Sequence, residues 1–174
     1  MLQRLFGLKR RPDAADGLYA QAVDQARDPA FYGRLGVADR IDSRFDLYVL
    51  HVQLLILRLQ AEGEAGRDLA QRLFDVFVSA LDNDLRELGV GDLSIAKKMR
   101  KLSEHVYGRM SAYEAGLIDA DESALSEAIA RNVAPTGPEA AAILARYAMV
   151  TRERLAAQSV DQMITSANWA KIEG

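Results

Sequence analysis

The chain has no cysteine, little proline and few aromatic residues, and each shortage excludes a class of structure or chemistry. Its 174 residues include 0 cysteines, 4 prolines and 7% aromatic residues. The absence of cysteine excludes disulfides, thiolate metal sites and cysteine nucleophiles. The scarcity of aromatic residues and proline, together with abundant Ala, Leu, Arg, Glu and Asp, favours helix over sheet. A net charge of -3 argues against a general nucleic-acid-binding protein, and we expect no DNA partner, although a local basic patch is compatible with this charge.

The chain also lacks an apolar run long enough to cross a membrane. Its longest charge-free stretch, 47–57, has 11 residues, whereas a membrane-spanning helix needs roughly 20. The surrounding segment, Phe45 to Leu59, is nevertheless apolar around nearly its whole circumference. We therefore predict a buried central helix here, capped by Asp42 or Ser43. The expected fold is all-α, with residues 13–174 forming a single-domain helical bundle of about six or seven helices around that central helix.

Apolar periodicity places two long helices after the central one. Residues 67–88 and 93–116 each carry one apolar stripe, and a turn containing Gly63 and Gly66 precedes the first. Asp84 lies on the apolar flank of the first helix, so it is either buried beside a base or partly exposed. Shorter helices are predicted at about 14–27, 124–132 and 138–158 and beyond 159, and a single helical turn followed by a loop is predicted within 30–37.

The first twelve residues form a basic tail. It contains Arg4, Lys9, Arg10 and Arg11, no acid, and Leu or Phe between them. Because the tail has no continuous apolar stretch and no small-residue cleavage site, we expect no signal peptide and a cytoplasmic location. Two interpretations are open. A basic amphipathic segment can attach weakly to anionic lipid, but a solvated tail is the favoured one.

A basic surface is predicted on the helix at 93–116, because its apolar stripe from Ile95 to Leu117 is committed to the core. The candidate partner-binding residues are Lys97, Lys98, Arg100 and Lys101, with Arg109 at the edge. Segment 75–92 carries net charge -4 and segment 96–109 carries net charge +4, so the two helices could pair with each other. The other interpretations are a contact with an anionic partner and a solvated helix face, the last being favoured on spacing alone.

A search for catalytic and metal-binding patterns gives little. His51 and His105 are the only histidines, and neither has a ligand four residues further on. His51 is expected to be a neutral, hydrogen-bonded core residue. The segment 119–123 resembles the start of a calcium loop but lacks its later Gly and Glu, so Asp121 or Ser123 is expected to cap a helix. Asp82 and Asp84 have no second acidic motif, which disfavours an isoprenoid enzyme. We predict no enzyme activity, no cofactor and no metal.

Two runs of the sequence carry a resemblance to a known family. The segments FYGRLGVADRIDSRFDLYVLHVQLLILRL and LFDVFVSALDNDLRELGVGDLSIAKKMRKLSEHVYGR resemble the ubiquinol-cytochrome c chaperone family over roughly residues 30–113. The resemblance implies an assembly factor, not an enzyme, that helps newly made cytochrome b enter the ubiquinol-cytochrome c reductase complex. It implies cytochrome b or its assembly intermediates as the partner, with peripheral contacts to an anionic membrane surface and to the ribosome as further candidates.

One alternative function is kept beside the chaperone. A helical bundle rich in Leu and Met could carry a hydrophobic ligand such as haem or quinone, with His51 or His105 as an axial ligand. Absorption near the haem Soret band would distinguish such a carrier from the chaperone.

Overall fold

The computed structural model describes residues 13–87, 91–133 and 136–172. The predicted basic tail, residues 1–12, lies outside the described residues. Within these ranges the chain forms eight helices and no strand: α1 (Ala14–Ala26), α2 (Pro29–Gly33), α3 (Ile41–Gln60), α4 (Gly63–Glu87), α5 (Asp92–Ile118), α6 (Glu122–Asn132), α7 (Gly137–Ala156) and α8 (Val160–Thr165). The predicted all-α class is confirmed, and the helical turn predicted within 30–37 corresponds to the short helix α2.

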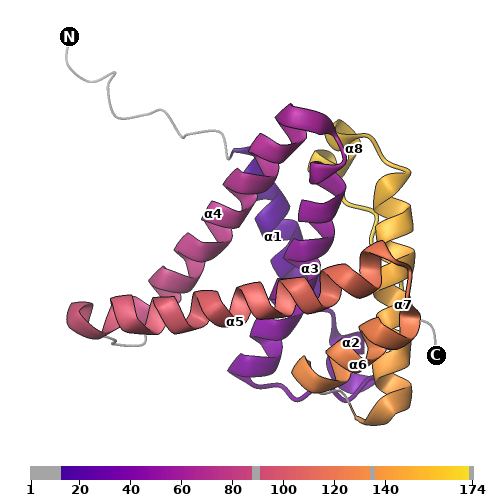
Figure 1. Ribbon diagram of the computed structural model, residues 1–174, viewed down its shortest axis with the longest axis horizontal. Helices are drawn as coiled ribbons and strands as arrows, with labels where there is room; N and C mark the ends of the chain where they lie inside the picture. The colour runs from indigo at the N-terminus through magenta and orange to yellow at the C-terminus, as the bar shows by residue number, and fades with distance from the viewer. Residues whose placement is uncertain (1–12, 88–90, 134–135, 173–174) are drawn as a thin grey trace.

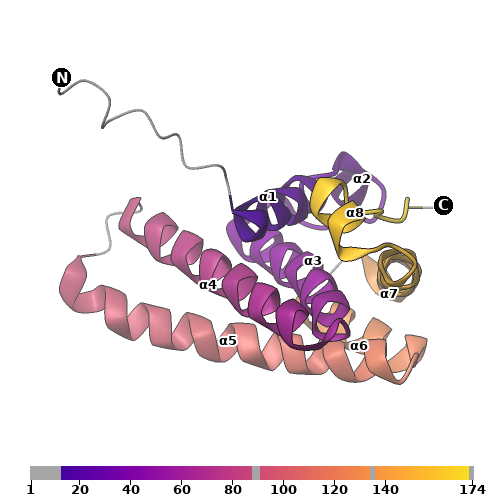
Figure 2. The ribbon, with the colours of Figure 1, turned by 90° about the horizontal axis from the view of Figure 1, so that it is seen from above.

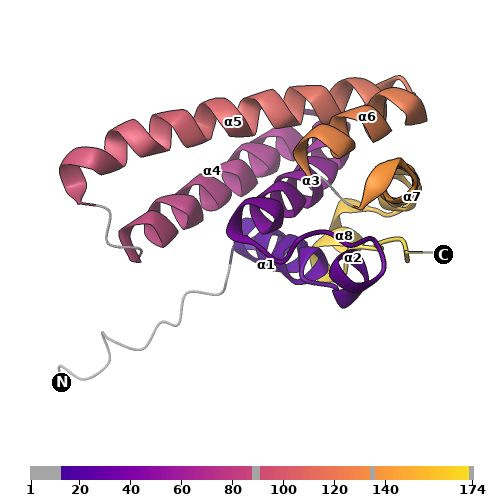
Figure 3. The ribbon, with the colours of Figure 1, turned by 90° about the horizontal axis from the view of Figure 1, so that it is seen from below.

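The helices are arranged in layers around α3. Figure 1 shows α3 near the centre with α7 running beside it and α5 crossing in front. Viewed from above and from below (Figures 2 and 3), α5 and α6 lie on one side and α1, α2 and α8 on the other, with α3 and α4 between them. The C-terminal half of α4 and the N-terminal half of α5 extend beyond the other helices. We call this extension the α4–α5 arm.

The predicted central helix is confirmed by its burial. Apolar side chains on all sides of α3 are inaccessible to solvent, namely Leu47, Val49, Leu50, Val52, Leu54, Leu55 and Leu59. The predicted cap is wrong, however, because α3 begins at Ile41 and its N-cap is Arg40, which makes no side-chain capping bond. Asp42 instead lies in the first turn, where its charge complements the helix dipole, and Ser43 is buried.

The turn between α3 and α4 is shorter than predicted, because the predicted turn contained both Gly63 and Gly66. Gly63 has φ +76°, a conformation that favours glycine, and α4 begins at this residue. Gly66 serves a different purpose inside α4, because a Cβ atom there would lie 2.2 Å from the carbonyl oxygen of Leu59. The second glycine therefore lets the start of α4 pack directly against the end of α3.

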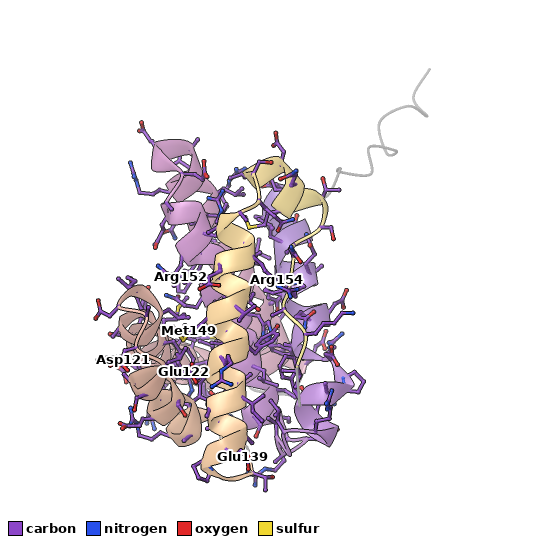
Figure 4. The ribbon with its side chains drawn as sticks, turned by 90° about the vertical axis from the view of Figure 1, so that its right-hand side faces the viewer. Asp121, Glu122, Glu139, Met149, Arg152 and Arg154 are labelled. Carbon is purple, nitrogen blue, oxygen red and sulfur yellow. The ribbon has the colours of Figure 1, made fainter. Side chains whose placement is uncertain are left out.

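The C-terminal residues are held against the bundle by side-chain hydrogen bonds to their backbone. Gln21 of α1 accepts a hydrogen bond from the Ala167 amide at 2.6 Å, and Thr151 of α7 accepts one from the Ala170 amide at 3.1 Å. Viewed along the side of the molecule that carries α7 (Figure 4), this segment descends from α8 beside α7. The segment places Trp169 over the centre of α3, with its ring 5.4 Å from the ring of His51.

Candidate partner-binding surface

Four of the predicted contact residues lie together on the α4–α5 arm. Lys97, Lys98, Arg100 and Lys101 are all exposed, and Ile95 on the opposite side of the helix is buried. Arg100 pairs with Glu104 of the same helix at 3.3 Å. In the described chain the three lysines pair with no acid, so they present uncompensated positive charge. We refer to these four residues as the basic face of α5.

The acidic residues of α4 do not neutralise the basic face. Arg86 pairs with Asp82 at 2.7 Å, and Arg100 pairs with Glu104, each within its own helix. Two environments were predicted for Asp84, burial beside a base and partial exposure. The side chain is exposed, which agrees with the second. The three lysines are therefore available to an external partner.

Arg109 belongs to a different environment from the other four. Its guanidinium Nε donates a hydrogen bond to the carboxylate of Asp46, and its charge lies 5.6 Å from the centre of the Phe45 ring. Asp46 is only 2% exposed. Burial raises the pKa of Asp46 to about 6, while the hydrogen bond and charge of Arg109 oppose that rise. The geometry joins α3 to α5, so Arg109 serves the packing of two helices.

A pocket of about 280 Å³ lies where α4 and α5 diverge from each other over α3. Figure 1 shows these three helices as the sides of a triangle. The pocket is lined by Gln53 and Ile56 of α3, Gln71 and Phe74 of α4, and Tyr107 and Glu114 of α5, among others. We call it the triangular pocket. The sequence analysis missed it, because its lining comes from three helices and follows no spacing along the chain.

Two polar side chains of the triangular pocket have no partner in the described chain. Gln53 is 3% exposed, and its side-chain oxygen accepts no hydrogen bond. Glu114 is half-buried and pairs with no base. Tyr107, by contrast, is 61% exposed, and its ring lies 5.6 Å from that of Phe74. The pocket therefore combines an aromatic edge with unpaired hydrogen-bond acceptors.

The two histidines occupy opposite environments. His51 is fully buried, with Nδ1 donating to the Leu47 carbonyl at 2.7 Å and Nε2 accepting from the Tyr147 hydroxyl at 2.9 Å. This confirms the predicted hydrogen-bonded core histidine. Since both ring nitrogens are engaged, the geometry argues against His51 as an axial ligand of haem. His105 is exposed on α5, away from any enclosed core position.

Asp121 caps α6 by accepting a hydrogen bond from the Ala124 amide at 3.0 Å, as predicted. Across the described ranges, no group of three or more His, Asp or Glu side chains is placed to hold a metal ion. In the described ranges, we find no helix that is both long enough and apolar enough to span a bilayer.

Comparison with known proteins identifies sequences and a structure that this chain resembles. The family described as Ubiquinol-cytochrome C chaperone matches residues 33–169. Ubiquinol-cytochrome-c reductase complex assembly factor 1 of Xenopus laevis is 24% identical over 120 residues, covering 69% of this chain and 60% of the relative. The protein of that name from Homo sapiens is 25% identical over 118 residues, covering 68% of this chain and 39% of the relative. The chain thus spans less than two thirds of the length of these curated relatives.

The fold is also found in a solved structure. The crystal structure of the Cbp3 homolog from Brucella abortus matches with a TM-score of 0.81 and 31% sequence identity. The match covers 91% of this chain and 90% of the other. Almost the whole helical arrangement described above is therefore shared with that protein.

Proposed function

Because this chain belongs to the ubiquinol-cytochrome c chaperone family, we propose that it is an assembly chaperone that binds newly made cytochrome b. In this role it would keep the subunit competent for assembly into the ubiquinol-cytochrome c reductase complex. The chaperone would act from the cytoplasm, at the cytoplasmic surface of the inner membrane. The proposal names one partner and one location, and each can be tested separately.

The observation that carries the proposal is the extent of the family match. It covers residues 33–169, and this range includes α3, α4, α5, α6, α7 and α8. The matched part therefore contains the buried axis, the basic face and the triangular pocket together. The relatives are named for the assembly of a complex and not for a reaction, which supports a binding function for these surfaces.

Deleting the gene is expected to lower the amount of assembled ubiquinol-cytochrome c reductase in the membrane. Loss of the chaperone leaves apolar segments of the new subunit unprotected, and exposed apolar surface leads to aggregation or degradation. The amount of complex is measured by native electrophoresis and haem spectra of membranes. Affinity capture of the intact protein should recover cytochrome b. Normal levels of the complex in the deletion strain would contradict the proposal.

We propose further that the basic face of α5 holds the chaperone near anionic lipid headgroups. Four bases within residues 97–101 create a field stronger than the net charge of the chain suggests. The α4–α5 arm carries them away from the other helices (Figure 2), so a flat surface can approach without meeting the rest of the protein. Each basic residue close to an anionic bilayer contributes about 1 kcal/mol.

Replacing Lys97 and Lys101 by Glu is expected to reduce binding to anionic vesicles about 30-fold or more, since it removes roughly 2 kcal/mol of attraction and adds repulsion. Binding is measured by co-sedimentation with phosphatidylglycerol-containing vesicles. Salt should weaken wild-type binding steeply, because exposed charges are screened over about 10 Å at 0.1 M. Helicity and the thermal midpoint should stay nearly unchanged, as both side chains are exposed.

The matched control is the double variant Arg67→Glu and Lys171→Glu. Both side chains are exposed and unpaired in the described chain, and the change in net charge is the same, but neither belongs to the basic face. The control should bind vesicles far better than the Lys97 and Lys101 variant. Equal binding by wild type and the Lys97 and Lys101 variant would show that the basic face is only a solvated helix surface.

A further inference from the structure

Two side chains of the triangular pocket, Gln53 and Glu114, offer hydrogen-bond acceptors that no group of the described chain pairs. The Gln53 oxygen is buried without a donor, and the Glu114 carboxylate has no base. Gln71 is exposed, and its amide nitrogen donates to Asp75 at 2.9 Å, while its oxygen is a further acceptor in the lining. Three helices thus contribute one acceptor each to a single pocket, and a donor-rich group would satisfy all of them.

Leaving the Gln53 oxygen unpaired is unfavourable for the isolated chain, because this oxygen is buried. A buried polar atom without a hydrogen bond destabilises a protein by about 1–3 kcal/mol, and apolar side chains would pack well among Ile56, Phe74 and Met110. An external ligand that donates to Gln53 would recover this free energy on binding. The composition of the pocket therefore indicates a binding site more than a packing position.

The shape and charge of the pocket select the chemistry of that ligand. Glu114 is the only charged residue of the lining, so the favoured occupant is a cation. Tyr107 and Phe74 present aromatic rings at the edge, and a guanidinium stacks on aromatic rings while donating several hydrogen bonds from its plane. Tyr107 and Glu114 are seven residues apart on α5, so they lie on one flank of that helix.

We propose that the triangular pocket binds an arginine side chain from a cytoplasmic loop of the membrane subunit that this chaperone assembles. This inference rests on the proposed function and specifies the part of the partner that is recognised. Cytoplasmic loops of membrane proteins carry an excess of Lys and Arg, so a pocket with one carboxylate and several acceptors suits them. The basic face, on the same helix, would meet the neighbouring anionic headgroups, and the two sites would select opposite charges.

The binding of loop peptides tests the pocket directly. The probes are fluorescein-labelled peptides copied from each cytoplasmic loop of cytochrome b, together with matched peptides in which citrulline replaces each arginine in turn. Citrulline keeps the shape of arginine and removes its charge. With the intact wild-type protein, one arginine peptide should bind at least roughly tenfold more tightly than its citrulline counterpart, as expected for a charged hydrogen bond. Binding is followed by fluorescence anisotropy.

Two variants assign this difference to the pocket. Glu114→Gln should remove the discrimination between arginine and citrulline. Gln53→Leu should weaken binding of the arginine peptide while the thermal midpoint stays the same or rises, because it removes an unsatisfied buried oxygen. The matched control is Glu139→Gln, which replaces another unpaired carboxylate that lies at the start of α7 on a different part of the molecule (Figure 4). It should leave the discrimination intact.

The outcomes separate this inference from the proposed function. Equal binding of the arginine and citrulline peptides to wild type, or full discrimination retained by Glu114→Gln, would overturn the pocket assignment. If detergent-solubilised cytochrome b is captured but no loop peptide binds, the pocket assignment fails and the proposed function stands. If the intact subunit is not captured at all, the proposed function fails and the inference fails with it.

Discussion

Replacing Arg109 by Met is expected to lower the free energy of unfolding by about 3 to 5 kcal/mol at neutral pH, the range seen when one partner of a buried ion pair is removed. The reason is the position of Asp46, which is 2% exposed and accepts a hydrogen bond from Arg109. Without the guanidinium, the carboxyl group between α3 and α5 would be either charged and unpaired in the core or forced to take up a proton. Methionine keeps the apolar stem of arginine, so the change removes mainly the charge. Urea titration followed by circular dichroism measures the loss.

The pH dependence of this loss identifies its cause. The pKa of Asp46 is raised to about 6 by burial, so the folded protein takes up a proton there more readily than the unfolded chain does. This group therefore favours folding at low pH, and its contribution falls as the pH rises through about 6. The Arg109→Met variant should accordingly lose less stability at pH 5, where Asp46 is protonated, than at pH 7.

Two further variants serve as controls for Arg109. The double variant Asp46→Leu and Arg109→Met removes both charges and should recover much of the loss, because replacing a buried pair by apolar residues is often nearly neutral. Arg100→Met removes a base from the same helix whose pair with Glu104 is exposed, and such pairs contribute about 0–1 kcal/mol. If both single variants lose similar amounts, the Asp46 pair is not a buried contact between α3 and α5.

Acidification is expected to destabilise the protein through His51 by roughly 2 to 3 kcal/mol between pH 7 and pH 4.5. Burial lowers the pKa of His51 to about 4, and the hydrogen bond to Leu47 and the charge of Asp28 only partly oppose this. The unfolded histidine titrates near 6.5. Below that pH the unfolded chain binds a proton that the folded chain excludes, so stability is present at neutral pH and is lost as the pH falls towards 4.

Over part of this pH range, the titration of Asp46 changes the unfolding free energy in the opposite direction. The effect of His51 is therefore measured as the difference in unfolding free energy between a variant and wild type. His51→Gln loses the ring contacts at every pH. Between pH 7 and pH 4.5, however, its unfolding free energy should fall by roughly 2 to 3 kcal/mol less than that of wild type. His105→Gln is the control, because His105 is exposed, and it should follow the wild-type profile. Fluorescence of Trp169, the only tryptophan, reports unfolding beside His51. Identical profiles for wild type and His51→Gln would contradict the prediction.

The Asp46–Arg109 pair also shows where interpretation of the sequence failed. Arg109 follows the bases of α5 in the sequence and shares their charge, so it was predicted at the edge of the basic face. Its direction on α5 instead points to the N-terminal part of α3, and Asp46 lies there. Neither periodicity nor local charge reveals such a pair, because its two members are separated by 63 residues.

The amino-acid sequence by itself determined the features that depend on local pattern. The apolar circumference of α3, the stripe on α5 and the proline in the first turn of α7 predict helices and their buried sides, since helical spacing fixes which side chains share a face. The exposure of Lys97, Lys98, Arg100 and Lys101 follows from the same argument. The family resemblance likewise rests on continuous runs of sequence.

Only the tertiary structure decided which side chains from different helices meet. The triangular pocket needs Gln53, Gln71 and Glu114 in one place, and His51 needs Tyr147, which is 96 residues away. The physical reason is that helix crossing angles and close approaches, such as that of Gly66 to Leu59, depend on the packing of the whole core. Local spacing determines the face of each helix, and packing determines what that face contacts.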